Sequence, residues 1–205
     1  VLAKHNERFR GIRDIEDTTQ YKPNQPLSYS NVPRALSYDS ILQEETGRRI
    51  RLLSPEQVIQ HWNSLPERNT TYADTNAIAV YPKEGPNEDL RQRVLSLTRQ
   101  QRTNVPLLVS GLAVEPADSK YGFTFTATDY MKVTEAPFLH QDGKISYDTE
   151  QGILAPSKEG VSIWTPSDQS GLRGAYRYWD EGLCLWGDGL LDSDEDGRVQ
   201  VIQDP

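Results

Sequence analysis

Residues 121–133, YGFTFTATDYMKV, alternate between two kinds of side chain, and this alternation decides the fold class. Tyr121, Phe123 and Phe125 fall on one face of an extended chain, together with Ala127, whereas threonines occupy the other face. A period of two is typical of a β-strand that buries one face. The stretch therefore predicts a strand whose aromatic side packs on a core.

Further strands are expected after this stretch. The run APFLHQDGKISY (136–147) predicts a hairpin that turns at Asp142 and Gly143. GAYRYWDEGLCLWG (174–187) predicts two strands that turn between Asp180 and Gly182. Two more strands are expected in GVSIWTP (160–166) and RVQVIQ (198–203). The C-terminal half is therefore predicted to be mostly antiparallel sheet.

The two main helices are expected in the N-terminal half. SPEQVIQHWNSLPE (54–67) begins with a capping box formed by Ser54 and Gln57. GPNEDLRQRVLSLTRQ (85–100) has Asn87 as its expected N-cap and an apolar stripe that includes Leu90 and Val94.

Two apolar segments on either side of the second helix, NAIAVYP (76–82) and VPLLVSGLAV (105–114), predict buried strands. A helix that joins two strands through short links favours a crossover, so the two strands are expected to form one parallel strand–helix–strand unit. Helices in the first half and antiparallel strands in the second half predict an α+β fold.

The first 45 residues are expected to be an N-terminal helix and an extended arm, and residues 46–205 a single α+β domain. Residues 1–16 have a weak amphipathic pattern, and residues 18–40 are rich in proline and tyrosine. Prolines at this density disfavour helices and sheet interiors. The arm is expected either to lie on its own domain or to dock on a protein partner or a second copy.

Charge and composition exclude some classes of function. The net charge is −8; residues 1–105 hold 15 Lys and Arg against 13 Asp and Glu, whereas residues 106–205 hold 7 against 17. Such an acidic half disfavours nucleic acid and favours cations or a basic partner. No apolar run approaches the roughly 18 residues of a membrane helix. Cys184, between two leucines, is expected to be a buried hydrophobe, and a single cysteine without a visible signal peptide favours the cytoplasm.

The acid run LLDSDEDGRVQVIQ (190–203) is the candidate metal site. Asp192, Asp194 and Asp196 alternate before Gly197, and the carbonyl of Arg198 follows, as in the first half of an EF-hand-type calcium loop. Gln203 stands where that loop needs a bidentate acid, and the flanking sequence is not helical. The run therefore predicts either a free-standing calcium loop or an acidic turn between strands.

Aromatic side chains gather just before the acid run. Tyr178, Trp179 and Trp186 are the candidate ligand or partner surface, because aromatic faces beside carboxylates suit sugars and cations. No nucleophile elbow, phosphate loop or zinc-ligand spacing is present in the sequence. The first functional hypothesis is thus a non-catalytic binding or assembly module with a calcium-binding acidic loop. The alternative is a carbohydrate-active hydrolase that uses carboxylates beside exposed tryptophans.

Overall fold

The computed structural model describes residues 32–47, 50–65, 72–85, 87–100, 102–178, 181–185, 197–199 and 201–203. The described part is an α+β arrangement of three α-helices and a large mixed sheet with short 3₁₀ segments. The predicted helix over residues 1–16 and the arm up to residue 31 lie outside the described residues. Within the described helices, no segment is long and apolar enough to cross a membrane.

Nine of the described strands form the main sheet, and most pairs of adjacent strands in it are antiparallel. Their order is β4-β3-β2-β8-β9-β7-β5-β6, with β10 beside β2. The strands are β2 (Tyr72–Val80), β3 (Leu107–Pro116), β4 (Phe123–Glu135), β5 (Gly143–Asp148), β6 (Ile153–Pro156), β7 (Val161–Trp164), β8 (Leu172–Tyr178), β9 (Gly182–Cys184) and β10 (Gly197–Val199). The pairs β7–β9 and β2–β10 are parallel. A separate two-stranded sheet joins β1 (Ile50–Leu52) to β11 (Val201–Gln203).

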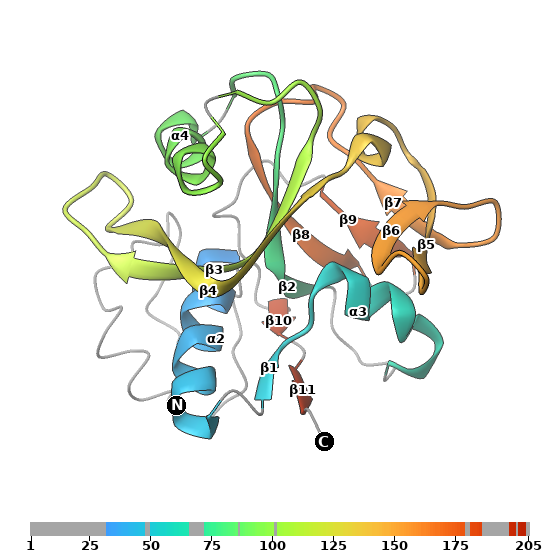
Figure 1. Cartoon of the computed structure of the whole chain (residues 1–205), viewed down its shortest axis with the longest axis horizontal. Coiled ribbons are helices and arrows are strands. Elements are labelled where there is room, and N and C mark those ends of the chain that lie inside the picture. Colours follow the sequence, from blue (N-terminus) through green and yellow to red (C-terminus); the bar gives the residue numbers. More distant parts are fainter. Residues whose placement is uncertain are drawn as a thin grey trace.

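The central strand β2 divides the interior into two clusters. Ile78 and Val80 belong to the first cluster, whereas the alternate residues Ala77 and Ala79 belong to the second. This division follows from the two faces of a strand. Figure 1 shows the corresponding two parts of the molecule. Strands β3 and β4 lie with α2 and α4 on one side, and β5, β6 and β7 lie on the other.

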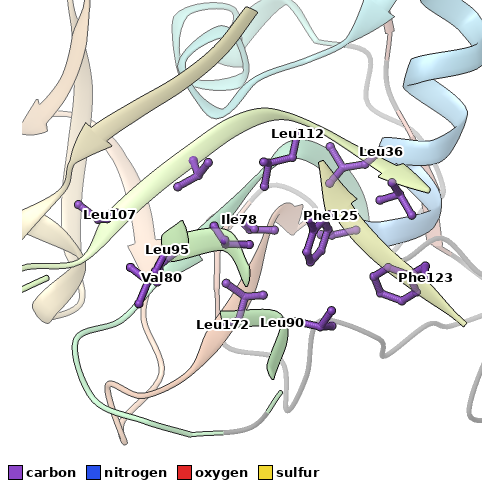
Figure 2. Close-up of a cluster of buried hydrophobic side chains, with 14 of the residues drawn as sticks. Leu36, Ile78, Val80, Leu90, Leu95, Leu107, Leu112, Phe123, Phe125 and Leu172 are labelled. Atoms are coloured by element: carbon purple, nitrogen blue, oxygen red, sulfur yellow. The ribbon is translucent and has the colours of Figure 1, made fainter. Parts of the chain in front are cut away.

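The first cluster confirms the aromatic strand predicted at 121–133. Phe123 and Phe125 are fully buried, and their rings meet edge to face at 5.5 Å between centroids. Figure 2 shows Phe125 beside Ile78, with Leu112 and Leu36 above them in the view. Burial of large aromatic side chains supplies much of the stability of a core of this kind.

The helix α2 (Val32–Thr46) corrects the prediction of an extended arm over residues 18–40. Its residues Val32, Leu36 and Ile41 are buried in the first cluster. Pro33 lies in the first turn, where a missing N–H leaves no intrahelical bond unmade. The helix therefore tolerates its proline, and burial of one apolar face fixes it on the sheet.

The two predicted helices are present but shorter than expected. In α3 (Pro55–Gln60) the capping box of Ser54 and Gln57 is confirmed, and the chain continues as a 3₁₀ turn over Trp62–Ser64. In α4 (Glu88–Leu97), Leu90 and Val94 are buried as predicted. The N-cap prediction for Asn87 is wrong in its mechanism, because this residue has a left-handed backbone (φ 62°) and its side chain makes no capping bond.

The predicted parallel strand–helix–strand unit is wrong. Strands β2 and β3 pair antiparallel, and Val80 lies opposite Leu107. The chain thus leaves and re-enters the sheet at one end, and α4 does not cross the sheet between them. Arg91 of α4 donates hydrogen bonds to the carbonyls of Tyr81 (2.9 Å) and Pro82 (2.7 Å), which holds the helix beside the end of β2.

Two further expectations for the sheet need correction. The sheet is not confined to the C-terminal half, since its central strand β2 lies in the N-terminal half. The hairpin expected over 136–147 is absent: Pro137–His140 is a 3₁₀ turn, and β5 starts at Gly143 and pairs with β6 and β7. The two strands predicted over 174–187 are present as β8 and β9, and their antiparallel register places Tyr178 opposite Gly182; Asp180, at the predicted turn, lies outside the described residues.

Candidate ligand pocket

A row of side chains from three adjacent strands forms the floor of the candidate pocket. Trp164 of β7 pairs with Cys184 of β9, which in turn pairs with Tyr176 of β8. Residues paired across strands project from the same face of a sheet, so these three side chains lie next to one another. Tyr178 follows Tyr176 by two residues and faces the same way, and it lines the same pocket.

Two large aromatic residues of the pocket are exposed. Trp164 is 41% exposed and Tyr178 is 38% exposed, whereas Phe123 and Phe125 are 0% exposed. The pocket above these rings has a volume of about 730 Å³. This volume lies within the range of roughly 300–1,000 Å³ that small-molecule and cofactor sites occupy.

One wall of the pocket is the loop after β7, and Asp142 fixes its start. Its Oδ1 atom accepts hydrogen bonds from the backbone N–H of Thr165 (2.7 Å) and from the Thr165 hydroxyl (3.0 Å). Thr165 is itself buried. Asp142, expected at the tip of a hairpin, instead joins the segment before β5 to the segment after β7.

The far end of this loop is held by contacts with His140 and with Arg173 of β8. Gln169 donates to the Pro166 carbonyl at 2.8 Å and lies 3.3 Å from His140 Nδ1 through its Oε1. Asp168 binds the buried guanidinium of Arg173 through both carboxylate oxygens, at 3.0 and 2.8 Å. The Ser170 hydroxyl, and then the Arg173 guanidinium, hold the pKa of Asp168 below its usual range.

The tyrosine at the centre of the floor is a neutral phenol. Burial raises the pKa of Tyr176 well above its ordinary value. Its ring meets Tyr72 of β2 edge to face, at 5.6 Å between centroids. Tyr176 is therefore a rigid apolar surface with a polar tip, and it is no candidate for a base near neutral pH.

The opposite face of β8 has a different role. Arg177 is buried, and its guanidinium carbon lies 5.0 Å from the centroid of the Trp62 ring. Tyr176 and Tyr178 thus lie on one face of β8, and Arg177 lies on the other. A second hollow of about 580 Å³ lies on that side, lined by Trp62, Tyr147 and neighbouring residues.

The structure describes only part of the candidate sites named from sequence. Trp179 and Trp186 lie outside the described residues, and so do Asp192, Asp194 and Asp196. Arg198 lies in β10, where its backbone is in register with Ala73 of β2. Among the residues that the structure does describe, no three His, Cys, Asp or Glu side chains are grouped to hold a metal ion.

The pocket brings together residues that the sequence did not select. Tyr178 was predicted, whereas Trp164, His140 and Asp142 were not among the chosen site residues. Trp164 ends a short strand and resembles any partly buried aromatic residue, so only its register with Cys184 places it in the pocket. The buried position predicted for Cys184 is confirmed, since it is 5% exposed.

No family model, curated protein or solved structure matches this chain. The function is therefore argued from the pocket itself.

Proposed function

We propose that this chain is a non-catalytic binding module that holds its ligand in the pocket above Trp164, Tyr176 and Tyr178. The observation that carries the proposal is the exposure of two large aromatic side chains, Trp164 and Tyr178, inside one concave site; the other exposed large aromatic residue of the described chain, Tyr130 of β4, does not line this pocket. Leaving such rings in water forgoes the stabilisation that their burial would give. A ligand that covers them recovers that stabilisation.

The construction of the wall supports a site that exists before the ligand arrives. Three contacts tie the loop after β7 to other parts of the chain: Thr165 to Asp142, Gln169 to His140, and Asp168 to Arg173. Binding then requires little ordering of the protein, and ordering is one of the main losses in free energy on association.

A carbohydrate-active hydrolase is the second candidate, because Asp142 and Glu181 line one pocket together with Trp164. Glycoside hydrolysis generally needs two carboxylates on either side of the scissile bond. One oxygen of Asp142 already accepts two hydrogen bonds from Thr165, which assigns it a role in holding the loop. This engagement favours binding over hydrolysis.

The calcium loop at Asp192, Asp194 and Asp196 and an association through the N-terminal arm belong to the same proposal. Light scattering of the whole chain and of a variant that lacks residues 1–31 tests the arm. Truncation at residue 31 spares α2, which packs in the core. If the arm mediates association, the whole chain should have a larger mass than a monomer and the truncated variant should not. Monomer masses for both proteins at high concentration would remove the arm from the proposal.

The test of the pocket is binding to immobilised sets of peptides and oligosaccharides, with two matched variants. Trp164→Ala removes a pocket ring, and Glu150→Gln changes an exposed residue that does not line the pocket. We expect ligands that bind the wild-type chain to bind Glu150→Gln equally well and to show no binding to Trp164→Ala. Ligands that bind both variants equally would refute the pocket, and sugar release that depends on Glu181 would favour the hydrolase.

A further inference from the structure

The charge of the pocket indicates what class of ligand it takes. Asp142 and Glu181 line it, and its described lining contains neither lysine nor arginine. A concave site of one charge sign concentrates ligands of the opposite sign.

Both carboxylates retain capacity for a ligand. The Oδ1 atom of Asp142 is occupied by Thr165, whereas its Oδ2 atom accepts no hydrogen bond from any described residue. Glu181 is exposed in the turn between β8 and β9, and within the described part of the chain its side chain forms neither a hydrogen bond nor an ion pair. Carboxylates in this state accept charge-assisted bonds from ammonium or guanidinium groups.

The rings supply the second half of a cation site. Trp164 and Tyr178 are the exposed aromatic residues of the pocket, and indole is the ring that attracts cations most strongly. The described part of the chain already uses this chemistry, with Arg177 at 5.0 Å from the Trp62 centroid and Lys120 at 4.8 Å from the Tyr121 centroid. Aromatic faces beside unpaired carboxylates are the arrangement that a guanidinium can stack on and bind at once.

From this combination we infer that the pocket binds a basic segment of a partner polypeptide, with an arginine or lysine side chain between the rings and the carboxylates. The inference rests on the proposed function, since it names the ligand of the same pocket. A volume of about 730 Å³ exceeds what a single basic side chain fills, so the occupant is a short run of residues.

The experiment uses three soluble probes and isothermal titration calorimetry on the whole chain. The first probe is a capped hexapeptide in which arginine alternates with alanine. The second is the same peptide with citrulline, which keeps the shape of arginine and lacks its charge. The third is maltohexaose, a neutral sugar. Each probe is titrated into the wild-type chain, Trp164→Ala, Trp164→Phe, Glu181→Gln and the control Glu150→Gln.

We expect the arginine peptide to bind and the citrulline peptide to bind at least about tenfold more weakly. Trp164→Ala should raise the Kd of the arginine peptide about tenfold, and Trp164→Phe should raise it less. Glu181→Gln should raise this Kd about threefold. Glu150→Gln should leave the Kd unchanged. Trp164→Phe keeps an aromatic ring, so its partial effect separates a lost contact from a damaged fold.

Two other outcomes overturn different parts of the argument. If the citrulline peptide or the sugar binds as tightly as the arginine peptide and still depends on Trp164, the cation inference is wrong and the binding module remains. If no probe binds, or if binding does not depend on Trp164, both the inference and the proposed function are wrong.

Discussion

The substitution Gly182→Ala should destabilise the protein far more than a surface change, because the backbone of β7 passes directly over this glycine. A Cβ atom at residue 182 would lie 2.1 Å from the carbonyl oxygen of Ser162, whereas ordinary contacts begin at 3.4 Å. The strands β7 and β9 would have to separate by about 1 Å. Gly182 also has φ +150°, which side chains rarely adopt.

The expected loss of unfolding free energy in Gly182→Ala has two contributions. The backbone conformation accounts for about 1–3 kcal/mol, and forced separation of packed strands for about 1–3 kcal/mol more. Gly152→Ala is the matched control. That glycine has φ +69°, and the nearest atom to its added Cβ is the Tyr147 hydroxyl at 3.8 Å. It should lose only the conformational part, about 1–2 kcal/mol.

Urea unfolding followed by circular dichroism measures both variants against the wild-type chain. We expect Gly182→Ala to lose about 2 kcal/mol more than Gly152→Ala, with an unchanged dependence on urea. Gly182→Ala should also weaken the binding of any ligand in the pocket, because Trp164 pairs with Cys184 across the strands that the substitution separates. An equal loss in the two variants would show that β7 and β9 do not approach as closely as the structure places them.

Three further predictions concern the core and the acid run. Burial raises the pKa of Asp39 from 3.8 to about 6, so the ionisation of Asp39 lowers stability as the pH rises through that range. Relative to Asp39→Asn, the wild-type chain should lose about 2–3 kcal/mol of unfolding free energy between pH 4 and pH 7. An equal pH dependence of unfolding free energy in the two proteins would contradict this. Arg91→Met removes the bonds to Tyr81 and Pro82 and should cost about 3–5 kcal/mol in urea unfolding, whereas a loss below about 1 kcal/mol would show that α4 is held by its apolar face alone. Calcium at 100 times its Kd should add about 2.7 kcal/mol and raise the melting temperature by several degrees, an effect that Asp194→Ala should abolish; overlapping melts with calcium and with chelator would identify the run as an acidic turn.

Local patterns were sufficient for several elements of the fold. The alternation at 121–133 predicted that Phe123 and Phe125 are buried, since the two faces of a strand depend only on sequence position. The capping box of Ser54 and Gln57 was predicted for the same reason, because all its atoms lie within one helical turn. The alternation did not hold over the whole face, since Ala127, which follows Phe125 by two residues, is exposed.

Other elements depended on contacts far along the chain. Prolines suggested an extended arm, yet burial of Val32, Leu36 and Ile41 against the sheet favours the helix α2, and one proline fits its first turn. A helix between two buried strands suggested a parallel crossover. The hydrogen bonds of Arg91 to the end of β2 instead keep α4 beside the return point of the chain.

The sequence by itself determined the α+β class, the acidic balance of the second half and Tyr178 as a candidate surface residue. Only the tertiary structure decided that Tyr176, Trp164 and Asp142 join Tyr178 in one pocket. The physical reason is register: Trp164 reaches Tyr176 through Cys184, across two strand pairings between segments that are separate in sequence. Asp142 reaches the pocket wall through hydrogen bonds to a residue 23 positions away.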